Sequence, residues 1–366
     1  MTTLRVVLDP LPPGADPDVV QASRDLAAAL VATSPSGCDV HAIVGSDGAA
    51  DIEGVAGVDR LPLRASAVAG LWAIGQRAGA GDGLIHSASL SAPLVRHDRV
   101  HDHDQTVVTV WDLRPWEFPD ELPAAEVRWA KAMLRRAHRH ADAVVAPTHE
   151  LARRLGEIAP FGDRIRVIAG APTPGLRVPS DEIGRRRGLD LPEGYVLMSG
   201  SFAPSHGLID AFAALVAAGR DTPAVVIDVP EGDEPAVTEL AAAAGLAEGR
   251  VRVRPRLDAA DRASVFGGAV AYLATEQGSG TPWRAIDALR LGVPTVATDT
   301  AVHREVLLDA AALAPAGDAE AMGAAVASAL GSTDAVERLS VLAADRGRAF
   351  GWAGAAERVW QLHADL

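Results

Sequence analysis

Short apolar runs alternate with amphipathic helical segments along almost the whole chain, and this alternation limits the possible folds more than any other feature. Strands are predicted at the β-branched, apolar runs 4–8, 40–44, 84–85, 106–110 and 143–146. Helices are predicted where apolar residues recur at helical spacing, at 18–31 and 124–141. Strands that alternate with helices predict a parallel sheet with helices on both faces.

A second series of the same kind follows a single break in the pattern. Between about 168 and 193 the composition shifts to Pro, Gly and Arg, and three closely spaced prolines interrupt regular structure. Further strands are predicted at 195–199, 224–229, 250–254, 270–274 and 295–297. The chain has 366 residues, more than the roughly 250 to 300 at which single cores stop growing. We therefore predict an α/β protein with two doubly wound, Rossmann-like domains, at 1–172 and 194–348, joined by a linker at 173–193.

The charge balance disfavours nucleic acid as a partner. The formal net charge is −14, whereas nucleic-acid binding depends on a basic face that neutralises phosphates. Two short basic clusters, at 135–140 and 185–187, are interpreted as solvated helix faces. The sequence has no apolar stretch of about 18 residues, and its first residues lack the pattern of a signal peptide, so a cytoplasmic location is expected.

The loops that follow the strands are where a ligand is expected, because open parallel sheets bind ligands beyond the carboxyl ends of their strands. One such region, His97 to Asp104, is rich in histidine and aspartate, which are ligand types that zinc or nickel accepts. The spacing follows no metal motif, so we interpret it as a polar surface loop and expect no metal.

The segment from Ser279 to Ala297 resembles the donor-site signature of glycosyltransferase family 4. It reads Ser-Gly-Thr-Pro-Trp-Arg-Ala-Ile-Asp-Ala-Leu-Arg-Leu-Gly-Val-Pro-Thr-Val-Ala, with Asp287 eight positions after Ser279 and a later Gly-x-Pro. In the family an acid stands at each of these two positions. A tight Gly/Pro loop before a helix presents backbone N–H groups that can meet a diphosphate.

The resemblance extends over most of the chain. Segments in the family's order and spacing are 83–87, 107–113, 141–148, 200–207, 299–306 and 350–360. It implies a GT-B architecture with two Rossmann-like domains facing a central cleft, and a last helix at 349–366 that returns to the N-terminal domain. It also implies a nucleoside diphosphate sugar as the donor substrate, no cofactor, no metal, and retention of configuration. Peripheral membrane contact, a homodimer and pairing with another glycosyltransferase all remain compatible with it.

The chain departs from the family at several donor-gripping positions. The glycine-rich first loop of relatives is here Pro10-Leu-Pro-Pro-Gly14, and Trp111 replaces the His of a His-Asp pair. Ser201 and His206 stand where relatives carry the Arg and Lys that grip the diphosphate. Charge-assisted hydrogen bonds contribute about 1.5 to 3 kcal/mol each, so losing two could weaken donor binding a hundredfold or more. Ser279 also replaces the first acid. Glu276, three residues earlier, could supply the missing carboxylate, but a solvated loop acid is the favoured interpretation.

Carried over position by position, the resemblance assigns catalytic roles to Asp287, Trp111 and Asp112. The donor-binding candidates are Gly14, Gly200, Ser201, His206, Gly207, Ser279, Gly280, Thr281 and Asp287. Alternatives remain open for three of these catalytic and donor-binding candidates. Asp287 could contact the ribose or only favour a helix dipole, Trp111 could stack on a sugar or lie in the core, and His206 could be a cation or cap a turn.

The resulting hypothesis is a hexosyltransferase. It would transfer a hexose or deoxyhexose from a nucleoside diphosphate sugar to a saccharide or lipid-linked acceptor. The alternative is a catalytically inactive homologue that acts as a partner or regulatory subunit of an active glycosyltransferase, which the lost donor contacts favour. Fold alone does not decide between the two.

Overall fold

The computed structural model describes residues 2–8, 16–98, 104–219, 221–247 and 249–366. The chain divides into two compact units. The first unit comprises Met1–Thr173, Ser279–Thr281 and Gly351–Leu366, and the second comprises Pro174–Gly278 and Pro282–Phe350.

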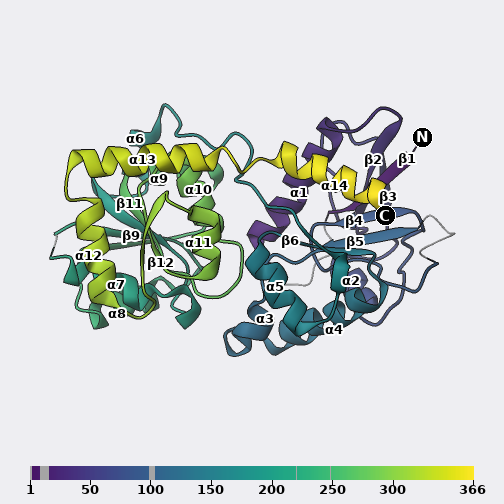
Figure 1. Cartoon of the computed structure of the whole chain (residues 1–366), viewed down its shortest axis with the longest axis horizontal. Helices are drawn as coiled ribbons and strands as arrows, with labels where there is room; N and C mark the ends of the chain where they lie inside the picture. Colours follow the sequence, from purple (N-terminus) through teal and green to yellow (C-terminus); the bar gives the residue numbers. More distant parts are fainter. Residues whose placement is uncertain (1, 9–15, 99–103, 220, 248) are drawn as a thin grey trace. The chain divides into compact units, whose positions relative to one another are not determined.

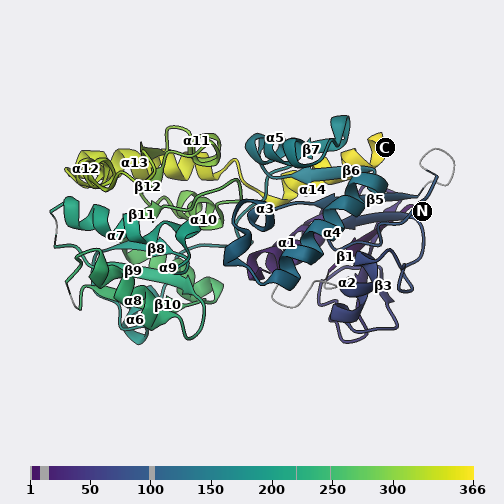
Figure 2. The same ribbon diagram turned by 90° about the horizontal axis from the view of Figure 1, so that it is seen from below.

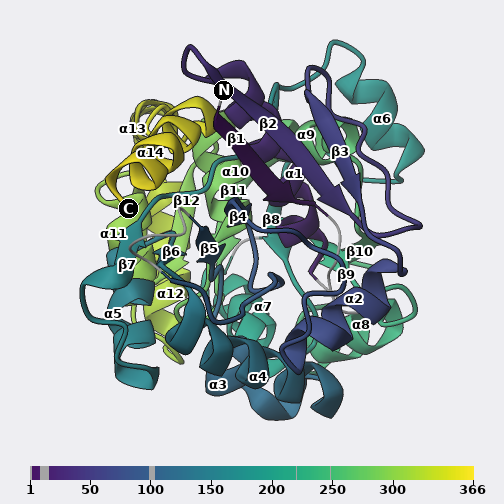
Figure 3. The ribbon, with the colours of Figure 1, turned by 90° about the vertical axis from the view of Figure 1, so that its right-hand side faces the viewer.

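The first unit contains a parallel sheet in the order β3-β2-β1-β4-β5-β6-β7. The strands are β1 (Thr2–Val7), β2 (Cys38–Val44), β3 (Gly57–Arg60), β4 (Leu84–Ser87), β5 (Gln105–Thr109), β6 (Ala143–Ala146) and β7 (Ile165–Val167). Figure 3 shows the purple arrows of β1, β2 and β3 side by side. The strand order reverses between β1 and β4, which makes this junction the topological switch point of the sheet.

Helices cover both faces of this sheet. They are α1 (Pro17–Ala32), α2 (Ala65–Ala73), α3 (Arg114–Glu117), α4 (Ala124–His140), α5 (His149–Ile158) and α14 (Trp352–Asp365), with short 3₁₀ turns η1 (Pro119–Glu121) and η2 (Gly162–Arg164). Because βαβ crossovers are right-handed, α1 lies on one face and α2, α4 and α5 on the other. The C-terminal helix α14 packs beside α1 (Figures 1 and 2).

The second unit has the same plan, with the strand order β10-β9-β8-β11-β12-β13. Its strands are β8 (Tyr195–Ser199), β9 (Ala224–Val229), β10 (Val251–Pro255), β11 (Ala269–Ala274), β12 (Thr295–Thr298) and β13 (Ala311–Ala314). Its helices are α6 (Glu182–Gly188), η3 (Pro204–His206), α7 (Leu208–Ala217), α8 (Glu234–Ala243), α9 (Ala259–Gly268), α10 (Trp283–Leu291), α11 (Ala301–Leu307), α12 (Ala319–Ala329) and α13 (Thr333–Gly347). The switch point lies between β8 and β11. Helix α7 packs on α12, and α10 packs on α13 (Figure 1).

Two features differ from the sequence-based expectations. The short edge strands β3, β7 and β13 were not predicted, because β3 and β7 carry charged residues and the Ala-Ala-Leu-Ala of β13 has no β-branched residue. The segment expected to be a linker carries α6, which packs on α9 within the second unit through an ion pair from Arg185 to Asp261. Within the described residues, no helix is both long and apolar enough to cross a membrane.

Helix α14 is fixed to the first unit by buried aromatic and imidazole groups. The indole N–H groups of Trp352 and Trp360 donate to the carbonyls of Pro172 and Leu30. Nδ1 of His86, in β4, lies 3.3 Å from Nε2 of His363, whose Nδ1 lies 2.9 Å from the side-chain oxygen of Gln105. These contacts form a chain of hydrogen bonds in which both rings are neutral. Nδ1–H of His86 donates to His363, and Nδ1–H of His363 donates to the amide oxygen of Gln105.

We expect acid to weaken this docking. Burial lowers the pKa of His363 to about 4, and burial together with His363 lowers the pKa of His86 well below its usual value. Between about pH 6.5 and pH 4 the unfolded chain takes up a proton at each histidine while the folded chain does not. The free energy of unfolding therefore decreases as the pH is lowered. His363 alone should account for about 3 kcal/mol over this window. Denaturant unfolding at several pH values in this range should show the loss of unfolding free energy. The loss should be smaller in His363→Gln and unchanged in His149→Gln, which replaces an exposed histidine. Equal acid sensitivity of His363→Gln and the native chain would contradict the assignment.

Candidate functional site

A cavity of about 110 Å³ lies in the first unit at the carboxyl ends of β1, β4 and β5, beside the switch point of the sheet. Asp16 and Val19 reach it from the start of α1, and Ser89 and Leu90 follow β4. Other lining residues come from the segment after β5 and from α4; they are Thr109, Val110, Trp111, Asp112, Pro115, Trp116, Glu126, Trp129 and Ala130. The cavity is therefore where a doubly wound sheet is expected to bind a ligand.

Three indoles form much of the cavity wall. Trp111 is 5% exposed, its N–H donates to the carbonyl of Ala88 at 2.7 Å, and its ring meets that of Trp352 edge to face at 6.4 Å. The N–H of Trp129 donates to the carbonyl of Ala69. Trp111 is thus buried against α14, as the core alternative predicts, and it also lines the cavity.

Two carboxyl groups of the cavity have unusual proton affinities. Burial raises the pKa of Asp112. The hydrogen bond from the backbone N–H of Arg114 and the charge of its side chain oppose this rise, and the charge of Glu117 adds to it. Burial also raises the pKa of Glu126, opposed by Arg114 and reinforced by Asp112. Oδ1 of Asp112 accepts the backbone N–H of Arg114 at 2.9 Å, whereas the carboxylate of Glu126 has no hydrogen-bond partner among the described residues.

The first residues of the donor-site signature are packed in the first unit beside this cavity. The backbone N–H and hydroxyl of Thr281 both donate to the carbonyl of Trp111, each at 2.9 Å. A Cβ on Gly280 would lie only 3.1 Å from Cβ of Asp112, so a larger residue there would push this segment away. Ser279, Gly280 and Thr281 are thus brought together with Trp111 and Asp112.

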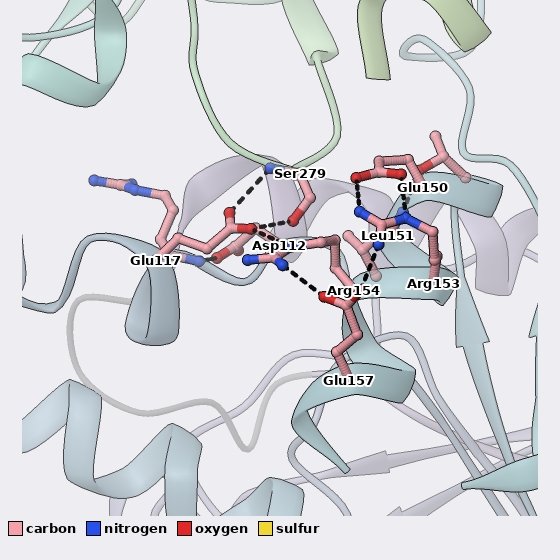
Figure 4. A network of polar contacts seen from close by, with 10 residues as sticks. Asp112, Glu117, Glu150, Leu151, Arg153, Arg154, Glu157 and Ser279 are labelled. Carbon is pink, nitrogen blue, oxygen red and sulfur yellow. Dashed lines mark hydrogen bonds and ion pairs between the residues drawn. The ribbon is translucent and has the colours of Figure 1, made fainter. Parts of the chain in front are cut away.

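Glu117, which sequence reasoning did not single out, supplies a carboxylate at Ser279 (Figure 4). Its oxygens accept the Ser279 backbone N–H at 3.0 Å and the hydroxyl at 2.8 Å. Arg154 lies 3.5 Å from the same carboxylate. The signature lacks an acid at Ser279, but the folded chain places the carboxylate of Glu117, 162 positions away in sequence, beside this residue. Glu276 is also held rather than solvated, because it accepts from the hydroxyl of Tyr272.

In the second unit, the loop between β8 and α7 is packed against the end of β11. Gly200 and Gly207 have φ angles of 121° and 65°, which favour glycine. A Cβ on Gly200 would lie 2.8 Å from the His206 ring, and one on Gly207 would lie 2.4 Å from the carbonyl oxygen of Thr275. At Gly207 the backbone of the loop therefore approaches the backbone after β11 closely, and at Gly200 it approaches the His206 ring.

Ser201 and His206 interact with each other in this loop. Nδ1 of His206 accepts the backbone N–H of Ser201 at 2.8 Å and lies 2.8 Å from its hydroxyl. A nitrogen that accepts a backbone N–H carries no proton, so in this geometry the ring is neutral. The contact supports the turn-capping alternative for His206, and the β8–α7 loop itself contains no Arg or Lys.

Asp287 lies in a buried ion-pair network of the second unit. It is 2% exposed, and Oδ2 lies 2.9 Å from a terminal nitrogen of Arg284 and 3.2 Å from Nε of Arg262. Arg284 also pairs with Asp228, which has an unusual φ of 60° at the end of β9. Because α10 begins at Trp283 and the carboxylate faces arginines, the contacts do not match a simple helix-dipole role.

The remaining predicted residues are placed as follows. Gly14 lies outside the described residues, and so does part of the histidine-rich loop. His97, from that loop, is buried against Asp142, with Nε2 3.0 Å from the carboxylate, so the surface-loop interpretation is wrong for its side chain. In the described parts of the chain, no group of three or more His, Cys, Asp or Glu could hold a metal.

Several residues of these sites were missed, although the sequence contained a partial signal for some of them. Three of the seven tryptophans fall between positions 111 and 129, and Glu126 and Trp129 share a face of α4 at i, i+3 spacing. Such clustering beside a predicted strand end could have identified the cavity. Nothing in the local sequence indicates the pairing of Glu117 with Ser279.

Comparison with known proteins finds a glycosyltransferase family that is similar to part of the chain. Residues 193–332, less than half of the chain, match the family described as glycosyl transferases group 1. No curated protein matches the chain by sequence. The resemblance to glycosyltransferase family 4 is confirmed, and the family match supports a transferase.

Solved structures show the fold. Sucrose-phosphate synthase of Thermosynechococcus elongatus is 19% identical, with a TM-score of 0.73 over 100% of this chain and 99% of that chain. HepE of Anabaena, solved with UDP-glucose, is 14% identical, with a TM-score of 0.73 over 100% of both chains. WaaG, a glycosyltransferase involved in lipopolysaccharide biosynthesis, is 13% identical, with a TM-score of 0.66 over 98% of both. The predicted GT-B architecture with two α/β domains is confirmed.

Proposed function

We propose that the chain transfers a hexose or deoxyhexose from a nucleoside diphosphate sugar to a saccharide or lipid-linked acceptor, without a metal or cofactor. The observation that carries this proposal is the family match over 193–332, which spans both the β8–α7 loop and the segment containing Asp287. The close approach at Gly200 and Gly207 supports a phosphate site formed by backbone N–H groups. UDP-glucose, which HepE was solved with, is the first donor to test.

The chemistry that we propose depends on positioning and on stabilising the departing diphosphate. Preorganised N–H groups can stabilise developing negative charge without a side-chain base. In this chain such groups would come from the loop after β8 and the start of α7, with Asp287 acting on the ribose through the network that holds it. The cavity of the first unit would hold the acceptor, with Trp111 and Asp112 in its wall.

A partner-subunit function is the second candidate, and specific contacts favour it. His206 is neutral in its turn, Asp287 is engaged by two arginines, and Ser279 is bonded to Glu117. Calorimetric titration with UDP, GDP, ADP and dTDP separates the candidates, because donor binding requires a nucleotide site and a silent subunit does not. Binding of one nucleotide together with hydrolysis of its sugar conjugate supports the transferase. Absence of both, with co-purification of another glycosyltransferase, supports the subunit.

The backbone approach at Gly207 allows a sharper test of the phosphate site. Gly207→Ala places a methyl group 2.4 Å from the Thr275 carbonyl, so the loop must shift. We expect affinity for the nucleoside diphosphate to fall at least about tenfold. Gly219→Ala is the matched control, because its φ of 62° imposes similar strain while its Cβ would meet no atom within 4 Å. Equal affinity of both variants in calorimetry would remove the loop from the binding site.

A further inference from the structure

We propose that the cavity of the first unit binds an amine-bearing acceptor, a saccharide or polyol whose protonated amino group lies between Asp112 and Glu126. This inference deepens the proposed function: that the ligand is an acceptor rests on the transferase proposal, whereas its amino group follows from the residues that line the cavity.

The charged residues of the described cavity lining are all acidic. Asp16, Asp112 and Glu126 contribute carboxyl groups from three different elements, and no Lys, Arg or His is among the lining residues that the structure describes. Arg114 lies close enough to oppose the pKa rise of both Asp112 and Glu126, but it does not line the cavity. A ligand in this space therefore meets carboxyl groups, with Arg114 acting on two of them from outside the lining.

The remaining walls suit an ammonium group as well. Trp111, Trp116 and Trp129 line the space, and the N–H groups of Trp111 and Trp129 are bonded to backbone carbonyls. Those two indoles thus offer ring faces and carbon edges, not donors, to a ligand. Aromatic faces attract ammonium ions, and the attraction increases where water is excluded.

The proton affinities of the two carboxyls indicate what the cavity lacks. Burial raises the pKa of Asp112 and of Glu126. A neighbouring carboxylate raises each pKa further, Glu117 for Asp112 and Asp112 for Glu126. A nearby opposite charge favours the ionised form, so an ammonium ion would relieve this repulsion. A neutral hydroxyl can hydrogen-bond to a carboxylate but leaves the charges uncompensated, and a phosphate would add to the repulsion.

Three monosaccharides that differ in their amino and phosphate groups provide the probes. Binding of glucosamine, glucose and glucosamine 6-phosphate to the full chain should be measured by ligand-observed NMR titration, without nucleotide. We expect glucosamine to bind at least about tenfold more tightly than glucose, and the phosphorylated amine to bind more weakly than glucosamine. Glucose binding as tightly as glucosamine, tighter binding of the phosphate, or no detectable glucosamine binding would each overturn the proposal.

Variants locate the binding. Glu126→Gln and Asp112→Asn keep shape and hydrogen-bonding capacity, and the asparagine oxygen can still accept the Arg114 N–H. Each should reduce the preference for glucosamine over glucose about tenfold. Glu53→Gln removes an equal charge at an exposed site of the same unit and should leave the preference unchanged. A preference that survives in Glu126→Gln and Asp112→Asn would place the amine elsewhere and overturn the proposal.

The experiment also separates this inference from the proposed function. If a nucleotide binds and its sugar is hydrolysed while glucosamine shows no preference over glucose, the transferase stands and the amine proposal fails. If glucosamine binds as expected but no nucleotide does, the cavity is an amine site and the transferase proposal fails.

Discussion

Replacing Asp287 with alanine is expected to lower the free energy of unfolding of the second unit by about 3 to 5 kcal/mol. Oδ2 of this buried carboxylate lies near both Arg284 and Arg262, so its removal leaves two buried guanidinium groups with less compensation than before. Thermal or urea unfolding in the absence of nucleotide measures the effect. The melting temperature should fall by several degrees or more.

The control for this variant is Asp309→Ala, which removes an exposed aspartate from the same unit. It should change stability by less than about 0.5 kcal/mol. A native melting temperature for Asp287→Ala, combined with weaker nucleotide binding, would instead assign the carboxylate directly to the ribose. Reduced stability and reduced binding together would mean that the network positions the ribose site.

Restoring an acid at the first position of the donor-site signature should destabilise the first unit. Ser279 is 3% exposed, and both its N–H and its hydroxyl are bonded to the Glu117 carboxylate. In Ser279→Glu a longer side chain must enter this space beside a like charge. We expect stability to fall by about 2 to 4 kcal/mol, from overpacking and from burying a second carboxylate.

A double variant tests the cause of that loss. Glu117→Gln combined with Ser279→Glu removes the repulsion but not the added volume, so it should recover part of the lost stability. A double-mutant cycle of melting curves gives the coupling energy between the two positions. A coupling near zero would mean that charge plays no part, and a fully native melting temperature for Ser279→Glu alone would contradict the packing described above.

The sequence predicted the sheets better than their edges or the contacts of the site residues. Central strands such as β8 and β9 are continuous apolar runs, because both of their faces are buried, and such runs are easily read. Edge strands bury less and lose that signal, as in the charged Gly-Val-Asp-Arg of β3.

The partners of the site residues depended on tertiary structure. Spacing shows that Asp287 follows Ser279 by eight positions, but not that it faces Arg262 from α9. Local sequence offers only Glu276, three residues before Ser279, as a source of the missing acid. The structure places Glu117 there instead, and only a folded chain brings positions 117 and 279 together.

The position of α14 has a consequence for the order in which the chain folds during synthesis. A ribosome completes the whole second unit before residues 352–365 emerge, yet these residues cover α1 and supply the indole beside Trp111 and the imidazole beside His86. Domains often fold in turn from the N-terminus. Here the unit that is made first is finished last, so the nascent chain carries an uncovered α1 face throughout translation of the second unit.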